Sequence, residues 1–254
     1  MQWQRGWQVL MATLMLLALA VSPSAYAASR RDGMAQQLVR ATWPHVLWFT
    51  LVATLLGVVL IRIVVVTAQS YGLSQYALEM VVRVLVLELL PLMAALFVAL
   101  RWSLPNAAEQ ARALRASHPP QDSASQDHAQ LHWLAQVALP RALAGVFAVW
   151  LLAAVSCVLG LVLAYLLVYG FTPWGMDAYT HMVGRVFSPA VTLIFTLKTL
   201  AFSLAVGVVP LASLAVQAGG ADRRALQGME VQGLVRMTGV LLVVEIVSLM
   251  GNYY

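Results

Sequence analysis

Five apolar stretches of the kind that cross lipid bilayers constrain the fold of this chain more than any other feature. A transmembrane helix needs about 20 predominantly apolar residues, and 61% of the 254 residues here are hydrophobic while only 10% are charged. Soluble domains carry about 25% charged residues, so we expect an all-α integral membrane protein with five transmembrane helices. The expected helices run from about His45 to Thr67, Tyr76 to Trp102, Pro140 to Tyr169, Pro189 to Val216 and Met237 to Met250.

The N-terminal segment, Met1 to Ala27, allows two interpretations. Its basic start, apolar run and small residues near Ala27 are typical of a cleaved signal peptide. The same segment also suits a retained hydrophobic helix that lies in the membrane interface. Export would place Arg30, Arg31 and Arg40 outside, against the tendency of positive loops to stay in the cytoplasm, so we prefer the retained helix. The expected division of the chain is an N-terminal helix with a basic linker over 1–44 and a five-helix transmembrane domain over 45–254.

Positive charge alternates between the links that join the apolar stretches. Links rich in Lys and Arg tend to face the cytoplasm, so the alternation predicts a cytoplasmic N-terminus and a periplasmic C-terminus. The basic links are 103–138 and 217–236, and the links poor in basic residues are 68–75 and 170–188.

The second apolar stretch carries residues that are unusual for a bilayer helix. Glu88 lies near the middle of Val81–Arg101, and Pro91 follows three residues later. A charged side chain at the centre of a membrane helix costs roughly 2.5–3.5 kcal/mol on insertion, so Glu88 needs a partner or a wet cavity. Proline cannot donate a hydrogen bond to the helix, so we expect Pro91 to bend this span.

Two further ionisable residues lie within apolar stretches, at a depth similar to that of Glu88. Lys198, the single lysine of the chain, is in the fourth stretch, and Glu245 is in the fifth. The three charges suit a buried ion pair that fixes helix packing or a polar patch in an outward-facing cavity, and the two hypotheses are compatible. Arg62 and Arg83 lie nearer to helix ends, where long side chains reach the interface.

The third stretch presents a face of small residues. Ser156, Gly160 and Ala164 follow at four-residue spacing, which favours close helix packing either within the subunit or in a dimer. Cys157, the single cysteine, is expected to act as a small apolar filler.

Motifs of several other functional classes are missing from the sequence. No phosphate-binding loop surrounds the single lysine, and no G-x-S-x-G nucleophile motif is present. His128 and His132 are four residues apart without a clear third ligand, so we predict no metal site. The arginines are not interleaved with aromatic residues as in RNA-binding surfaces, so we expect no nucleic-acid partner.

The polar landmarks of the spans occur in a fixed order, which is Glu88-Leu89-Leu90-Pro91 through Arg101, Ala108-Glu109, Pro140-Arg141-Ala142-Leu143-Ala144-Gly145, Lys198 and Glu245. This order resembles the MlaE-type permeases of ATP-binding-cassette lipid transporters, which work with MCE proteins. The resemblance spans roughly residues 37–252, and the segment after Glu109 departs from the family pattern. At position 245 the family usually has aspartate.

This resemblance implies a permease subunit of the bacterial inner membrane that moves phospholipid or a related lipid and is not itself an enzyme. It implies three protein partners: a second permease copy, a periplasmic MCE-domain protein and a cytoplasmic ATPase. The ATPase would bind ATP and Mg²⁺, so no cofactor is expected in this chain. The expected cavity groups are Glu88, Lys198 and Glu245, and the expected ATPase-coupling residues in loop 103–138 are Glu109, Arg112 and Arg115.

Two alternatives from other classes remain open at this stage. The chain could be a non-transporting scaffold, in which the buried charges set helix register and the loop 103–138 is a docking tether. It could also be an ion-coupled carrier that uses Glu88, Lys198 and Glu245 as a relay, because ionisable residues inside membranes often form such relays.

Overall fold

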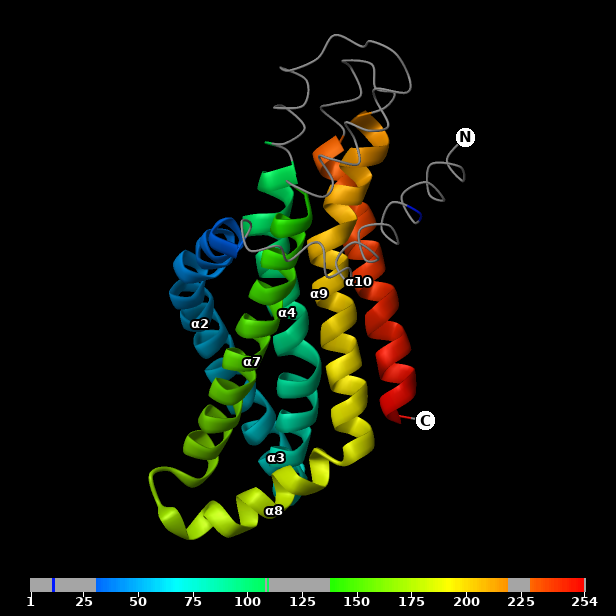
Figure 1. The fold of residues 1–254 in the computed structure, drawn as a ribbon. Coiled ribbons are helices and arrows are strands. Elements are labelled where there is room, and N and C mark those ends of the chain that lie inside the picture. The colour runs from blue at the N-terminus through cyan, green and yellow to red at the C-terminus, as the bar shows by residue number, and fades with distance from the viewer. Residues whose placement is uncertain (1–10, 12–30, 108, 110–137, 219–228, 254) are drawn as a thin grey trace, which may run out of the picture. The chain divides into compact units, whose positions relative to one another are not determined.

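Helices make up the regular structure of the described part of the chain. The computed structural model describes residues 11, 31–107, 109, 138–218 and 229–253, and its regular elements in these ranges are all helical (Figure 1). The expected N-terminal helix within Met1–Ala27, together with Arg112, Arg115, His128 and His132, therefore lies outside the described residues, apart from Met11.

Five described helices are long and apolar enough to cross a membrane, which confirms the predicted fold class. They cover Thr42–Ser70, Tyr76–Ala107, Leu139–Tyr169, Pro189–Leu211 and Gly233–Gly251. The elements in chain order are α2 (Arg31–Ser70), α3 (Ser74–Val81), η3 (Val82–Leu89), α4 (Leu90–Val98), η4 (Ala99–Ser103), α7 (Leu139–Tyr169), η6 (Pro173–Gly175), α8 (Met176–Val186), α9 (Pro189–Ala218) and α10 (Met229–Tyr253).

Two of these elements differ in detail from the expectation. The helix α2 begins at Arg31 and contains Pro44, so the expected basic linker is helical from Arg31 onward. The second span changes its hydrogen-bond pattern along its length: η3 and η4 are π-helical, and α3 and α4 are α-helical. Apolar length predicts that a helix exists but not which backbone hydrogen bonds it uses.

The chain divides into two compact units. Unit 1 comprises Met1–Trp43, Val98–Ala148 and Ser203–Leu241, and unit 2 comprises Pro44–Phe97, Val149–Phe202 and Leu242–Tyr254. The five residues of interest in the second, third, fourth and fifth spans, Glu88, Pro91, Cys157, Lys198 and Glu245, all belong to unit 2.

The second span is the most buried of the five spanning helices. Most of its apolar residues between Val81 and Ala95 are buried, whereas α2 exposes one apolar face, as expected for a helix beside lipid. The buried residues of the second span are Val81, Val82, Leu85, Val86, Leu87, Leu90, Ala94 and Ala95, and the exposed face of α2 is formed by Leu47, Leu51, Leu55, Val59, Ile63 and Val66.

The small face of α7 packs within the subunit. Ser156 and Ala164 are buried, and a Cβ added to Gly160 would lie only 2.7 Å from Leu90 Cδ1. A side chain at position 160 would therefore collide with the second span, so the within-subunit alternative holds for this face.

In unit 1, α7 and α9 approach each other closely at two glycines, a contact that the sequence did not reveal. A Cβ added to Gly207 in α9 would lie 2.6 Å from the Ala142 carbonyl oxygen of α7, and one added to Gly145 would lie 3.3 Å from Gly207 Cα. Small residues allow helix backbones to approach in this way. Because the obstacle at position 207 is backbone, no rotamer change can relieve a substitution there.

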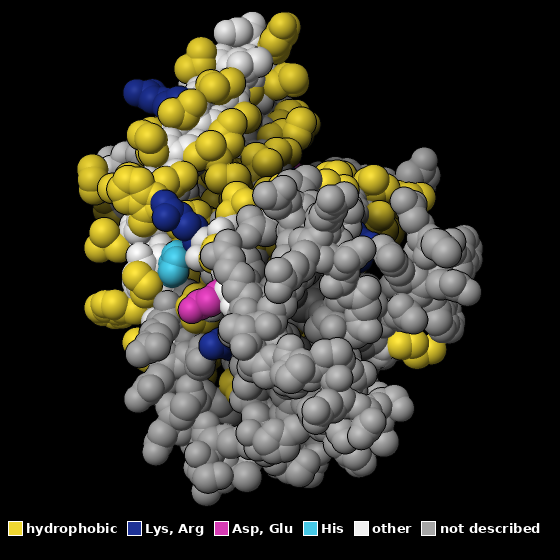
Figure 2. Space-filling view, turned by 90° about the horizontal axis from the view of Figure 1, so that it is seen from above, with side chains coloured by type: hydrophobic (Ala, Val, Ile, Leu, Met, Phe, Trp, Pro, Cys, Tyr) yellow, Lys and Arg dark blue, Asp and Glu magenta, His cyan; other side chains and the backbone are white. Residues whose placement is uncertain are grey.

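Hydrophobic side chains also dominate the described surface seen in Figure 2, where few charged side chains are visible. In Figure 1, α8 runs crosswise to the long helices at the end where α7 finishes and α9 begins. It contacts α3 and η3 of unit 2.

Candidate functional site

The candidate site begins with the unusual backbone of η3. The N–H of Leu90 donates to the carbonyl of Leu85, five residues earlier, instead of the carbonyl four residues earlier that an α-helix uses. Such π-helical segments are rare and often occur at functional sites. Glu88 lies within this segment and is buried.

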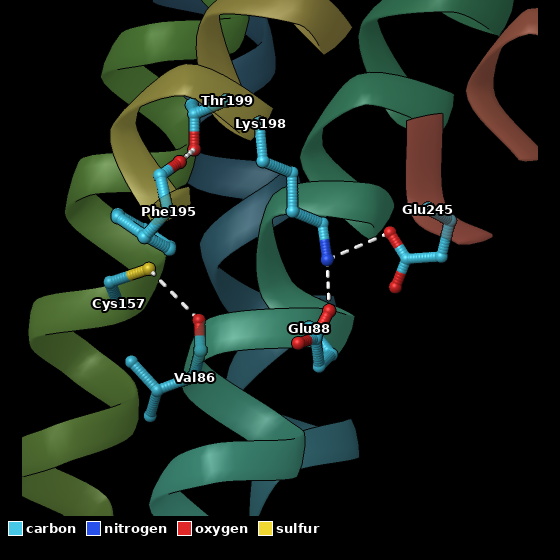
Figure 3. A network of polar contacts seen from close by, with 7 residues as sticks. All are labelled: Val86, Glu88, Cys157, Phe195, Lys198, Thr199 and Glu245. Carbon is cyan, nitrogen blue, oxygen red and sulfur yellow. Dashed lines mark hydrogen bonds and ion pairs between the residues drawn. The ribbon is translucent and has the colours of Figure 1, made fainter. Parts of the chain in front are cut away.

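Pro91 removes one possible backbone donor to a carbonyl in η3. In a π-helix the Val86 carbonyl would accept from residue 91, but proline has no N–H, and the N–H of Leu90 is already bonded to Leu85. The Cys157 thiol of α7 takes this place, with Sγ 3.5 Å from the Val86 carbonyl oxygen (Figure 3). Cys157 is therefore a hydrogen-bond donor, a role that the sequence did not predict.

Lys198 joins two acidic residues from two other helices. Its Nζ in α9 forms an ion pair with Glu88 Oε2 of η3, and it lies 2.8 Å from Glu245 Oε2 of α10. Figure 3 shows the lysine side chain pointing between the two carboxylates. The structure thus brings together all three of the intramembrane charges that the sequence placed at similar depth.

The charge cluster, defined as Glu88, Lys198 and Glu245, is almost sealed from the surroundings. The Lys198 side chain is 1% exposed and that of Glu88 is 9% exposed, while Glu245 is the most accessible at 14%. The Lys198 Nζ also lies 5.6 Å from the ring centroid of Phe202, within the range of a cation–π interaction. The ammonium group is therefore held by charged and aromatic partners inside the protein.

Arg62 and Arg83, in the first and second spans, lie in more exposed surroundings than the charge cluster. Arg83 forms a local ion pair with Glu79, one helical turn away, at 2.9 Å, and the two side chains are 40% and 34% exposed. Arg62 is exposed on α2. Both arginines are accessible, as expected for side chains that reach toward an interface.

The cluster offers one ammonium and two carboxylates. An ammonium group forms strong charge-assisted hydrogen bonds with carboxylates and phosphates. Among the described residues, no group of three or more His, Cys, Asp or Glu side chains could hold a metal ion.

The residues predicted to couple to an ATPase belong to another part of the chain. Glu109 is helical and exposed in unit 1, whereas Arg112 and Arg115 lie outside the described residues. Their role stays a prediction.

Comparison with known proteins adds an independent observation. The family model described as Permease MlaE matches residues 34–250, a range that includes all three members of the charge cluster. A search of curated proteins found no match to the chain.

Proposed function

Because the chain belongs to the MlaE permease family, we propose that it moves phospholipid or a related lipid between the inner membrane and a periplasmic MCE-domain partner. Family membership makes it the membrane permease subunit of an ABC-type lipid transporter. Its five apolar helices make it a multi-pass membrane protein. The C-terminus would face the periplasm.

The observation that carries the proposal is the bridging position of Lys198 between Glu88 and Glu245. A phospholipid headgroup contains a phosphate, which prefers a cation such as Lys198. The headgroup would enter by replacing one carboxylate partner of the lysine. Glu245 is the partner with the greater exposure, so it would be the one displaced, while Glu88 would keep its ion pair.

Energy for this exchange would come from a partner chain. A cytoplasmic ATPase with its own ATP and Mg²⁺ would dock on loop 103–138, near Glu109, Arg112 and Arg115. Two permease copies would then move as rigid bodies, opening and closing a lipid pathway lined by Glu88, Lys198 and Glu245.

A lipid-transfer assay with the reconstituted complex tests the role of the cluster. We expect Lys198→Ala and Glu88→Ala each to abolish transfer, whereas Arg83→Ala, which breaks an exposed ion pair, should leave it intact. Wild-type transfer in both cluster variants would overturn the proposed role.

A further variant separates lipid binding from helix packing. Replacing all three charges by neutral side chains (Glu88→Gln, Lys198→Met and Glu245→Gln) removes the ion pairs without leaving a buried charge alone. If this variant folds, binds the ATPase and still fails to move lipid, the charges act on the lipid.

The scaffold function is the second candidate, favoured by the near-complete burial of Lys198 at 1% exposure. In that case the neutral variant should assemble less well than the wild type, because the charges set helix register, and lipid should not change the turnover of a co-purified ATPase. A stoichiometric ATPase whose turnover responds to lipid favours the permease function.

A further inference from the structure

The turn between α7 and α8 presents two large apolar side chains outward. Phe171 is 93% exposed and Trp174 is 92% exposed, the highest values among the described large hydrophobic residues. Both lie in unit 2, just beyond Tyr169, where α7 ends. Neighbouring large apolar groups that are this exposed are typical of protein or membrane contact sites.

Hydrogen bonds and close packing hold this turn in shape. Gly170 has a φ of +71°, a conformation that glycine adopts without steric cost. The hydroxyl of Thr172 donates to the Tyr169 carbonyl at 2.8 Å, and the Tyr165 hydroxyl donates to the Thr172 carbonyl. A Cβ on Gly175 would lie 2.5 Å from the Tyr169 ring, so this ring lies directly against the turn.

Three tyrosines form the base on which the turn rests. The rings of Tyr165, Tyr169 and Tyr179 lie 5.2 to 6.4 Å apart, and the Tyr179 hydroxyl donates to the Leu161 carbonyl at 2.8 Å. Burial, with a smaller contribution from Tyr169, raises the pKa of Tyr179 to about 12. The hydroxyl therefore remains a donor at physiological pH and ties α8 to α7.

The lipid-facing surface of α7 continues into the exposed turn. Val158, Val162 and Val168 of α7 are exposed, and in a membrane-spanning helix such residues face hydrocarbon. The sequence from Tyr165 to Met176 contains no charged residue. Tryptophan is enriched at the boundary between bilayer and water, and Trp174 lies five residues after the last residue of α7.

The far side of α8 is different in character. Tyr179, Met182 and Val186 face the protein, whereas Asp177, His181 and Arg185 are exposed. The two most exposed apolar side chains thus lie in the turn beside the membrane-spanning helix, and exposed polar side chains follow along α8.

We propose that Phe171 and Trp174 insert into the membrane–water interface at this end of α7 and anchor α8 to the lipid surface. The anchor binds lipid at the bilayer boundary and is separate from the charge cluster. Because α8 contacts α3 and η3, it also holds the end of the span that carries Glu88 at a fixed height in the bilayer.

Fluorescence quenching by brominated lipids tests the anchor. The full chain is reconstituted alone into phosphatidylcholine–phosphatidylglycerol vesicles whose acyl chains carry bromine either near the headgroup or near the chain end. The chain has eight tryptophans, so the Trp174 signal is the difference between the wild type and Trp174→Phe. We expect shallow bromines to quench this difference signal more than deep bromines do, because tryptophan favours the boundary between bilayer and water.

A matched control moves the fluorophore to the polar side of α8. In the double variant Trp174→Phe, His181→Trp, the new tryptophan is expected to escape quenching by either lipid. An unquenched Trp174 signal would overturn the proposal, as would equal quenching at position 181. A Trp174 signal that becomes shielded only when the periplasmic partner protein is added would also overturn it, because a protein surface would then be the occupant.

Discussion

Two ion-pair sites share the second span yet differ in almost every physical respect. Glu79 and Arg83 are one turn apart on the same helix, and both are accessible. Glu88 meets Lys198 across 110 residues of sequence, and both side chains are buried. The comparison teaches that opposite charges alone do not identify a functional site. Helix geometry produces the local pair at almost no cost, whereas the buried cluster requires desolvation of three charges.

That difference bears on why the cluster exists. A buried ion pair often contributes no more stability than apolar residues of similar size, because desolvation offsets the attraction. An arrangement that is expensive and not needed for stability is best explained by specificity or by function, which is consistent with the proposed lipid pathway.

The largest expected effect follows from removing the central lysine. Lys198→Ala leaves Glu88 and Glu245 without their cation in a buried setting, and breaking a buried pair in this way costs about 3–5 kcal/mol. The free energy of unfolding, measured by SDS titration in mixed micelles, should fall by that amount. A fall of less than about 1 kcal/mol, the range of exposed pairs, would mean that the charge cluster contributes no more to stability than the Glu79–Arg83 pair.

Neutralising the whole cluster should cost much less than removing the lysine alone. In Glu88→Gln, Lys198→Met, Glu245→Gln no unpaired charge remains, so the free energy of unfolding should stay close to that of the wild type. The same SDS titration checks this. A loss as large as that of Lys198→Ala would mean that the charges stabilise the helix packing directly.

Removing a neutral hydrogen bond in the same unit shows how much of the stability loss in Lys198→Ala is due to charge. Cys157→Ala removes the donor to the Val86 carbonyl and should lower the free energy of unfolding by about 1 kcal/mol. Pro91→Ala restores a backbone N–H beside that carbonyl, so Cys157→Ala should cost less in the Pro91→Ala background. Cys157→Ser, which keeps a donor, is the matched control. Equal costs of Cys157→Ala in both backgrounds would contradict the role assigned to Pro91.

The smallest effect is expected at the exposed pair. Arg83→Ala should lower the free energy of unfolding by about 0.3–0.5 kcal/mol, as for other pairs one helical turn apart. Added salt should reduce this difference, since exposed charges are screened, and should hardly change the effect of Lys198→Ala. Unfolding titrations at low and high salt measure this difference in salt dependence between Arg83→Ala and Lys198→Ala.

Much of the fold follows from the apolar lengths of the sequence. Five stretches long enough to cross a bilayer predict five spanning helices, and all five are present. The close contact of Gly145 with Gly207 was not predictable, because it depends on how α7 and α9 cross in unit 1. Glycines are common in membrane helices, so their spacing alone does not indicate which of them meet.

The charge cluster was predictable in membership but not in geometry. Counting residues placed Glu88, Lys198 and Glu245 at similar depth, and a single lysine among acids on other helices indicated a pairing. Depth does not determine rotation about a helix axis, so the sequence could not show that Lys198 bridges both acids. The role of Cys157 was hidden for another reason: it depends on the π-helical hydrogen bond between Leu90 and Leu85, which no side-chain pattern reveals.

The π-helical segment η3 also has a consequence for how this protein tolerates changes of length. In a π-helical segment each backbone hydrogen bond encloses one more residue than in an α-helix. The segment η3 therefore resembles an α-helix into which one residue has been inserted. A one-residue deletion within Val82–Leu89 would favour the ordinary α-helical pattern and rotate the residues on one side of it relative to those on the other. Glu88 and the apolar residues of α4 could then no longer both face their present neighbours. The number of residues between Val82 and Leu89, as well as their types, therefore determines whether the three charges meet.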